Sequence, residues 1–507
     1  MAASPTKSTF PPSLDVLEQE HLVQVIKDWS IAHGLAVRPP TAVAANDPEG
    51  ILAINAPVTL FPSPFPKACF EDAKAVQKAY NELYANISRD EKFLEELVHE
   101  VAAGDDFISN LWDVHLKVKE EGYVQNLTLG LFRSDYMVHH DDDGLQIKQV
   151  EFNTIASSFG GLSSQTSALH KHLAATEYPL LHNSAALPPL DLPPNLSTTS
   201  LAAGLAAGYT AYGPSALHHP TCILFLVQPS ERNIFDQRHL EYALHSQTSA
   251  PIFRLTLPSL PSHTTLGPAR QLLYHPPHNP ALTYECAVTY LRAGYGPADY
   301  PTPLAWSARR TVERSATIAC PSVLAQLSGM KKVQQVLASS AETLLARFLS
   351  KAADRAAVRR TFTNIYPLDG TAAGLAAREI ATDAERCVGY VMKPQREGGG
   401  NNVYRGAIPG RLGELPEGHW GSYILMELIT PPAVGNVILR NGRLEEGGVI
   451  CELGVYGACL WDRSVGVGGG GVVYNEEAGY LLRTKGDQSE EGGVAAGFGC
   501  MDSVVLV

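Results

Sequence analysis

The chain has 507 residues, 45% of them hydrophobic and 18% charged, so it can bury a large core and is not a disordered protein. Its 39 Lys and Arg against 52 Asp and Glu give a net charge of −13, which argues against a nucleic-acid partner. The sequence shows no signal-peptide core and no apolar run long enough to span a bilayer, so no membrane partner is expected. Eight scattered cysteines without a CxxC pair indicate reduced thiols in a cytoplasmic protein and no zinc site.

The N-terminal part is predicted to begin with three amphipathic helices, over residues 13–29, 70–83 and 90–101. Two strands are expected next, over 126–133 and 146–152, separated by an Asp-rich turn that ends in glycine. We assign these elements to a first part of the chain, residues 1–215, which holds the N-terminal helices and the first strands of the main sheet.

The middle of the chain alternates apolar strands with helices. An Ala- and Gly-rich helix over 201–212 leads to strands over 222–227, 252–257 and 287–291. This βαβ rhythm is typical of a small parallel sheet and predicts a substrate-binding domain over residues 216–327.

The C-terminal part, residues 328–507, is predicted to contain helices followed by one final sheet. The helices are expected over 331–348 and 371–385, and the strands over 390–393, 423–427, 449–453 and 479–483. The glycine run at 468–471 has no Lys, Ser or Thr in place for a phosphate loop, so we interpret it as a flexible turn. The whole pattern predicts the α/β class.

A second glycine run carries the strongest chemical signal, because residues 393–402 read KPQREGGGNN. Three successive glycines permit positive φ and let backbone N–H groups wrap an anion. On the glycines alone, this interpretation and that of a hairpin tip with incidental charges are about even. The surrounding positive charges and amides favour phosphate binding, and Glu397 could hold a metal ion.

Glu151 and Asn153 stand two residues apart at the end of a predicted strand, so their side chains are expected on one face. Carboxylate and amide oxygens suit Mg²⁺ that keeps waters and phosphate oxygens as its other ligands. A hydrogen-bonded pair at a strand end is the commoner explanation of such a pattern. Together with Glu397, however, the pair would supply three oxygen ligands.

Basic residues mark three further segments. Arg483 and Lys485 would share a strand face, although charged residues on a strand also serve to block aggregation at an exposed edge. Arg133 follows one strand and the Glu-Arg-Asn sequence at 231–233 follows another, where parallel sheets bind ligands. Either could instead be a helix cap with a surface ion pair. The GGVAAG segment at 492–497 could approach a ligand or form a tight turn.

In this combination the chain resembles eukaryotic-type glutathione synthetases, members of the ATP-grasp superfamily with a permuted order of elements. The resemblance covers about residues 61–507. It rests on the segments FRSDYM, VEFNTIASSFGGL, SERNIFDQR, LRAGYG, SGMKKVQQ, KPQREGGGNN, YILMELI, CELGVYG and LLRTK followed by GGVAAG.

The resemblance implies an ATP-dependent ligase that joins γ-glutamylcysteine to glycine and releases glutathione, ADP and phosphate through an acyl phosphate. It also implies an ATP-grasp fold with a small parallel-sheet substrate domain and a lid, two Mg²⁺ ions per subunit and a homodimer. The alternatives are a ligase for another amine, β-alanine or serine, and a nucleotide-binding module without catalysis. The GGVAAG sequence favours glycine as the acceptor amine, because relatives that accept other amines have a different sequence in this segment.

The resemblance also implies roles for individual residues. The metal ligands would be Glu151, Asn153 and Glu397. Catalysis would rest on Arg483, Lys393, Gly398 and Gly399. ATP would contact Glu151, Lys331, Lys393, Pro394, Gln395, Arg396, Glu397, Gly398, Gly399, Gly400, Asn401, Asn402, Tyr404, Met426, Glu427, Leu428, Ile429, Glu452, Lys485 and Glu491. The peptide side would use Arg133, Ile155, Ala156, Ser157, Ser158, Glu231, Arg232, Asn233, Gln237, Arg292, Ala293, Gly294, Tyr295, Arg483, Val494 and Ala495.

Overall fold

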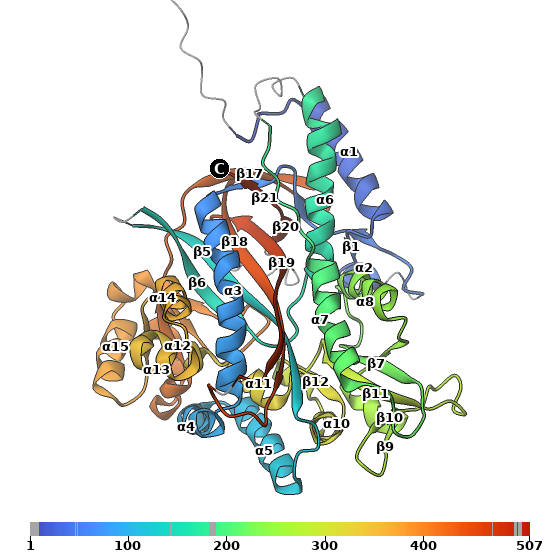
Figure 1. The fold of residues 1–507 in the computed structure, drawn as a ribbon. Helices are drawn as coiled ribbons and strands as arrows, with labels where there is room; N and C mark the ends of the chain where they lie inside the picture. The colour runs from blue at the N-terminus through green and yellow to red at the C-terminus, as the bar shows by residue number, and fades with distance from the viewer. Residues whose placement is uncertain are drawn as a thin grey trace, which may run out of the picture.

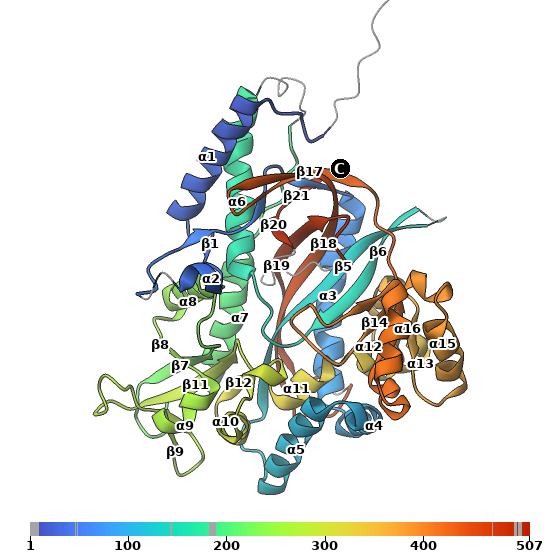
Figure 2. The same cartoon turned by 180° about the vertical axis from the view of Figure 1, so that it is seen from behind.

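The computed structural model describes residues 10–45, 47, 49–141, 144–181, 189–468, 470–490, 494 and 499–507. Its centre is a seven-stranded sheet, with the six-stranded sheet on one side and the four-stranded sheet with its helices on the other (Figure 1). The same arrangement is seen from behind in Figure 2. Mixed α/β structure is therefore confirmed, whereas the ATP-grasp element order and the three domain boundaries stay predictions.

The seven-stranded sheet combines strands from both ends of the chain, in the order β17-β3-β20-β19-β18-β5-β6. These strands are β3 (Val58–Thr59), β5 (Leu127–Asp141), β6 (Gly144–Asn153), β17 (Val434–Arg440), β18 (Arg443–Asp462), β19 (Val472–Gly486) and β20 (Cys500–Asp502). The long β18 pairs antiparallel with β19 along one side and with β5 along the other. The sheet thus brings segments more than 300 residues apart into adjacent positions.

Helices cover both faces of this sheet, but one face only in part. α3 (Lys67–Ser88) lies on the face to which Gly457 belongs, since a methyl group at Gly457 would meet the Asn81 side chain of α3. α7 (Ser197–Tyr212) packs on the other face, where its Gly204 lies against Ala458 and Leu131. Successive side chains of a strand point to opposite faces. The face on which α7 packs therefore continues from Leu131 to the charged residues further along β5.

The six-stranded sheet confirms the predicted parallel βαβ rhythm. β7 pairs in parallel with β8 and β11, and β11 pairs in parallel with β12. β9 and β10 extend the sheet in antiparallel fashion, which the apolar pattern did not indicate. The strands are β7 (Thr221–Leu226), β8 (Ile252–Leu255), β9 (Thr264–Leu266), β10 (Leu272–Tyr274), β11 (Tyr284–Leu291) and β12 (Ile318–Cys320).

The prediction of one final C-terminal sheet is wrong. The strands near 390 and 424 join a separate four-stranded sheet, in the order β13-β16-β14-β15. Those near 449 and 479 belong to β18 and β19 of the seven-stranded sheet, where β18 pairs with β5 of the N-terminal part and β19 pairs with β20. The four strands are β13 (Ile365–Pro367), β14 (Tyr390–Lys393), β15 (Val403–Tyr404) and β16 (Ile424–Glu427).

Most predicted helices are present, with shifted ends. The helix expected over 331–348 is interrupted at Ser340, which divides it into α12 and α13. Within the described residues, no helix is both long and apolar enough to cross a membrane. The other helices are α1 (Val16–Ala32), α2 (Thr41–Ala44), α4 (Glu91–Val101), α5 (Asp106–Glu121), α6 (Gly160–Thr176), α8 (Ile234–Thr248), α9 (Leu260–His263), α10 (Pro303–Arg314), α11 (Val323–Ser328), α12 (Lys331–Ser339), α13 (Ala341–Phe348), α14 (Ala352–Thr361), α15 (Ala372–Thr382) and α16 (Ile408–Glu414).

Short strand pairings join residues 58–65 to residues 500–506. β20 pairs in parallel with β3, and β21 (Val504–Leu506) pairs in parallel with β4 (Ser63–Phe65). Buried Asp502 accepts hydrogen bonds from the hydroxyl groups of Thr59, Ser63 and Thr484. A further two-stranded sheet consists of β1 (Ala36–Val37) and β2 (Ile54–Asn55).

Candidate active site

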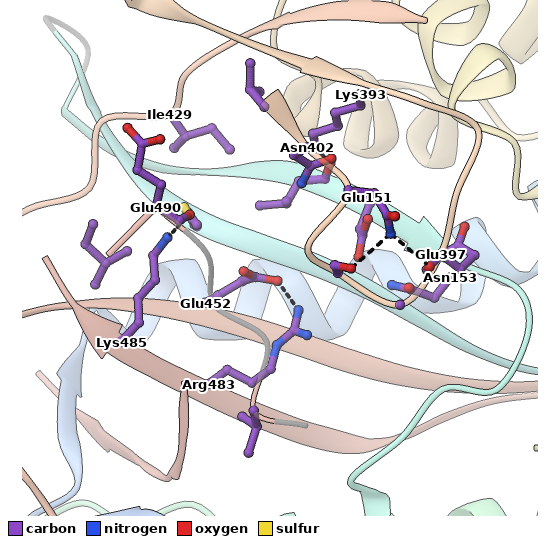
Figure 3. Close-up of a pocket in the computed structure, with 18 of the residues that line it drawn as sticks. Glu151, Asn153, Lys393, Glu397, Asn402, Ile429, Glu452, Arg483, Lys485 and Glu490 are labelled. Atoms are coloured by element: carbon purple, nitrogen blue, oxygen red, sulfur yellow. Dashed lines mark hydrogen bonds and ion pairs between the residues drawn. The ribbon is translucent and has the colours of Figure 1, made fainter. Parts of the chain in front are cut away.

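A cavity of about 520 Å³ opens between the uncovered part of the seven-stranded sheet and the four-stranded sheet. Figure 3 shows Glu151, Asn153 and Glu397 grouped on one side of it, and Glu452, Arg483 and Lys485 on another. Strands β5, β6, β18 and β19 supply the first wall, and β14, β16 and the glycine segment supply the second.

Most of the predicted site residues line this cavity. They are Arg133, Glu151, Asn153, Ile155, Ala156, Ser157, Ser158, Tyr295, Lys393, Arg396, Glu397, Gly398, Gly399, Asn401, Asn402, Tyr404, Met426, Glu427, Leu428, Ile429, Glu452, Arg483, Lys485 and Val494. The predicted residues outside its lining are Glu231, Arg232, Asn233, Gln237, Arg292, Ala293, Gly294, Lys331, Pro394, Gln395 and Gly400. Glu491 and Ala495 lie outside the described residues.

Lys331 lies directly behind the lining, between two carboxylates. Its Nζ is 3.1 Å from Glu151 Oε2 and 3.0 Å from Glu397 Oε1. Burial acts to lower the pKa of the Lys331 ammonium, but the two carboxylates outweigh it and raise that pKa. Burial raises the pKa of Glu397 to about 7, against the opposing effect of Lys331. Two carboxylates thus share the ammonium group of Lys331 beside the cavity.

Asn153 turns its amide nitrogen away from this pair. Its Nδ2 donates to Asp135 Oδ2 at 3.0 Å and to the Arg133 carbonyl at 3.2 Å. Both hydrogen bonds use the nitrogen, so the amide oxygen is the atom that remains for a cation. The oxygen-rich character of Glu151, Glu397 and Asn153 suits Mg²⁺ rather than a softer metal. Among the described residues, no group of three or more His, Cys, Asp or Glu side chains is placed to hold a metal ion.

The glycine segment adopts a backbone that only glycine favours. Gly398, Gly399 and Gly400 have φ of 97°, 69° and 73°, and three such residues in succession would strain any other amino acid. The segment is anchored at its base, where Arg396 forms an ion pair with buried Asp105. Asp105 also caps α5 by accepting from the backbone N–H groups of Phe107 and Ile108.

Lys393 enters the cavity from the end of β14. Its Nζ donates to the Val150 carbonyl at 2.9 Å, which joins the four-stranded sheet to β6. Burial lowers the pKa of Lys393, and the neighbouring Glu151 opposes that shift. Lys393 and Lys331 thus place two ammonium groups on the side of the cavity where Glu151 and Glu397 lie.

Arg483 lies on the opposite side of the cavity. It forms ion pairs with Glu452 and, at 2.9 Å, with Asp135 Oδ2. Burial acts to lower the pKa of Arg483, but these two carboxylates raise it. Its Nε is buried and has no hydrogen-bond partner among the described residues. A ligand anion would satisfy this donor, because a buried N–H group without a partner is costly.

The residues predicted for the peptide side divide into two layers. The Ser157 and Ser158 segment lines the cavity, and Arg292 supports it by donating to the Ser157 carbonyl at 2.8 Å and to Ser158 Oγ at 2.7 Å. Glu231 lies further away, where it accepts from the Asn233 backbone N–H and from Gln237 Nε2. The loop before α8 therefore contacts the cavity only through intermediate residues.

Several lining residues were missed by sequence reasoning. The apolar ones, Met137, Val150, Phe159, Val391, Pro431 and Ile450, give no chemical signal in a sequence. Asp135 does not line the cavity and was not assigned to the site, although it stands two residues from Arg133 on the same strand and contacts it directly. Side chains two residues apart on a strand lie on the same face, so the FRSDYM segment could have indicated this pair.

Comparison with known proteins agrees with this site. Residues 17–506 match the family described as eukaryotic glutathione synthase, ATP-binding domain. The chain is 38% identical to the glutathione synthetase large chain of Schizosaccharomyces pombe, with 96% of this chain and 97% of that protein covered. It is 36% identical to the glutathione synthetase of Homo sapiens, with 96% and 97% covered. A solved structure of a glutathione synthetase-like effector from Globodera pallida, in the apo form, has the same fold, with a TM-score of 0.72, 22% identity and 98% of each chain covered.

These relatives and the charged cleft define the class of the protein as an ATP-dependent ligase. The chain belongs to the eukaryotic glutathione synthase family. The family expected from the sequence motifs is thereby confirmed, as is the expectation of an enzyme.

Proposed function

We propose that this cleft joins the carboxylate of γ-glutamylcysteine to the amine of glycine at the expense of ATP, and that it uses the residues assigned above. The observation that carries the proposal is the pair of carboxylates on Lys331, with Lys393 beside them and the glycine segment above. Such a cluster can hold a metal–nucleotide complex and neutralise the charge of a transferring phosphoryl group.

Glu151, Glu397 and Asn153 would hold Mg²⁺. The fit rests on their oxygen ligands, which Mg²⁺ prefers, and on the arrangement of two carboxylates around one ammonium group. When bound, Mg²⁺ would supply positive charge to the phosphates. We further propose two such ions per subunit, as in the family.

The residues of the chain would act by binding and orienting. Lys331 and Lys393 would contact phosphate oxygens, while the left-handed backbone of residues 398–400 would present N–H groups to them. The dipeptide carboxylate attacks the terminal phosphorus and ADP leaves. The glycine amine then attacks the acyl carbon, and phosphate leaves with the shared oxygen. Arg483, with its unsatisfied Nε, would hold an anionic group in this step.

Closure of the glycine segment would protect the acyl phosphate from water. The adenine ring would lie against Met426, Leu428 and Ile429, which supply apolar contact at the end of β16. The GGVAAG sequence favours glycine as the acceptor. Acceptance of β-alanine or serine is the second candidate, since one methylene changes discrimination by only about 1–3 kcal/mol.

We also propose a cytoplasmic homodimer. All eight cysteines are free thiols, which suits a reducing compartment. The N-terminal helical part is the proposed interface, because Val16, Leu17 and Ile31 of α1 are exposed. Analytical ultracentrifugation tests the dimer, and a single species of 54.6 kDa would contradict it.

The deciding experiment measures phosphate release from ATP with Mg²⁺, γ-glutamylcysteine and either glycine, β-alanine or serine, with the peptide product identified by mass. We expect release that requires the dipeptide and glycine together and yields glutathione. Release with another amine instead would replace the product. No release with any amine, from protein that binds ATP, would refute the ligase.

A further inference from the structure

Asp135 stands at the centre of the charged site without being one of the residues assigned to substrate, nucleotide or metal. It lies on β5, the second strand from the edge of the seven-stranded sheet, and its side chain is fully buried. Its register neighbours are Glu151 on β6 and Gly454 on β18. A buried carboxylate in this position needs compensating donors, and the structure provides several.

Four donors from three strands converge on this one carboxylate. Arg133 forms a paired contact, with Nε 2.6 Å from Oδ1 and Nη2 2.8 Å from Oδ2. Arg483 Nη2 reaches Oδ2 at 2.9 Å, and Asn153 Nδ2 reaches the same oxygen at 3.0 Å. Asp135 therefore contacts an arginine proposed for the peptide, an arginine proposed for catalysis and a proposed metal ligand.

Gly454 makes this convergence possible. Arg483 lies on β19 and Asp135 on β5, so their ion pair crosses β18 at this glycine. A methyl group there would stand 2.8 Å from Asp135 Oδ1 and 2.7 Å from Arg133 Cδ. The missing side chain thus leaves the space in which the two arginines share one carboxylate.

The contacts also determine which atoms face the cavity. Arg133 uses Nε and Nη2 on Asp135, so Nη1 is left to point towards the Ser158 carbonyl, 3.4 Å away. Asn153 uses its nitrogen for both hydrogen bonds, so its oxygen is the atom left for a ligand. Without the negative charge between them, the two guanidinium groups would repel each other in a place shielded from water.

We propose that Asp135 is a positioning residue, which fixes Arg133, Arg483 and Asn153 as one unit and so links the alignment of the dipeptide to the metal site. The inference rests on the proposed function of the cleft. Asp135 acts through its neighbours and does not itself touch substrate.

The test is Asp135→Asn, which keeps the shape but replaces one acceptor oxygen by a donor that faces guanidinium N–H groups. We expect kcat/KM for γ-glutamylcysteine to fall about 100-fold, the scale for breaking a buried hydrogen-bonded charge pair, mainly through KM. The Mg²⁺ concentration for half-maximal activity should rise as well, because Asn153 loses its acceptor. The KM for ATP should change far less.

Two further variants separate positioning from plain stability. Gly454→Ala displaces the carboxylate without changing its charge, and should raise the dipeptide KM in the same way. Glu285→Gln is the control, because Glu285 is another buried carboxylate, bonded to Tyr212 and Ser215 away from the cavity. It should lower the melting temperature and leave KM unchanged. A loss of melting temperature without a rise in KM in both Asp135→Asn and Gly454→Ala would overturn the proposal.

A crystal structure of Asp135→Asn completes the test independently of activity. We expect displaced Arg133 and Arg483 side chains in an otherwise unchanged sheet, and both arginines in their original places would overturn the proposal. If wild-type protein forms no glutathione, the proposed function fails, and this structure still decides whether Asp135 positions the arginines. If wild-type protein forms glutathione and Asp135→Asn keeps its dipeptide KM, only the positioning role fails.

Discussion

At the scale of single residues, two adjacent lysines show how the same side chain can serve the site or the fold. Lys331 and Lys332 begin α12, and their side chains are 4% and 3% exposed. Lys331 binds Glu151 and Glu397 beside the cavity. Lys332 points away and binds Glu100 and Asp369. Neighbouring residues on a helix are about 100° apart, which explains the separation.

The two lysines allow a prediction in which the variant of one serves as the control for the other. Lys331→Met should lower kcat/KM about 100-fold or more, because the charge proposed to neutralise phosphate is lost at the site. Lys332→Met should lower the melting temperature at least as much, since it too removes a buried ammonium group that binds two carboxylates, but should keep most of the activity. Steady-state kinetics and thermal melts of both variants check this. Equal activity losses in the two would contradict the assignment of Lys331.

The glycine segment allows a second matched comparison. Gly399 and Gly406 both have open space where a methyl group would lie, but only Gly399 has a positive φ. Gly399→Ala should therefore strain the backbone by about 1–2 kcal/mol and lower turnover about tenfold, whereas Gly406→Ala should be close to neutral. Turnover numbers at saturating ATP test the difference, and two indistinguishable variants would show that the backbone conformation is not needed.

At the scale of elements, α6 is tied to the strands beneath it by a buried histidine. His170 contacts the Thr59 carbonyl of β3 through Nε2 at 2.9 Å, and Ser503 Oγ through Nδ1 at 2.7 Å. Burial lowers its pKa to about 4. The imidazole is therefore neutral in the folded protein, donates from Nε2 to the carbonyl and accepts at Nδ1 from the hydroxyl group.

Because the pKa of His170 is lowered in the folded protein, the free energy of unfolding depends on pH. Between pH 6.5 and 4 the unfolded chain binds a proton that folded His170 does not, so the free energy of unfolding falls as the pH falls, by at most about 3 kcal/mol. In His170→Gln this contribution is absent, so urea denaturation should show a shallower pH dependence in that range. Parallel curves for the two proteins would contradict the prediction.

Local sequence patterns predicted the positions of strands better than they predicted which strands pair. The four residues of β14 and the parallel strands β7, β8 and β11 follow from apolar runs and their spacing. The extent of β18 and its place beside β5 do not, because long-range pairing leaves no mark in a local window. For the same reason Lys331, a residue of an unremarkable polar pair at a helix start, is assigned to the site only through the resemblance.

At the scale of the whole molecule, the cavity lies between two sheets, and side chains that line or border it connect its two walls. Lys393 to the Val150 carbonyl and Lys331 to Glu151 and Glu397 are contacts of this kind, and both involve groups proposed to bind ATP. Binding of ATP should therefore draw the four-stranded sheet and its glycine segment towards the seven-stranded sheet. The alignment of reactants then depends on a movement of elements rather than of single side chains.

Hydrogen exchange tests this movement. With Mg²⁺ and ATP, amides of residues 397–404 should exchange more slowly than in the free protein, whereas those of β7 and β11 should not change. The comparison within one molecule serves as its own control. Identical exchange at 397–404 in both states would contradict closure of the segment over the nucleotide.

The position of β20 between β3 and β19 has a consequence for biosynthesis. β20 stands between β3 and β19, so the strand that carries Arg483 and Lys485 gains its outer neighbour only when residues 500–502 are in place. The backbone of Val507 also bonds to Lys67 and Phe65. A nascent chain on the ribosome therefore cannot complete this sheet until residues 500–502 have been synthesised. Truncation of the chain before Cys500 would remove the strand that pairs with both β3 and β19, and would therefore block this last step of assembly.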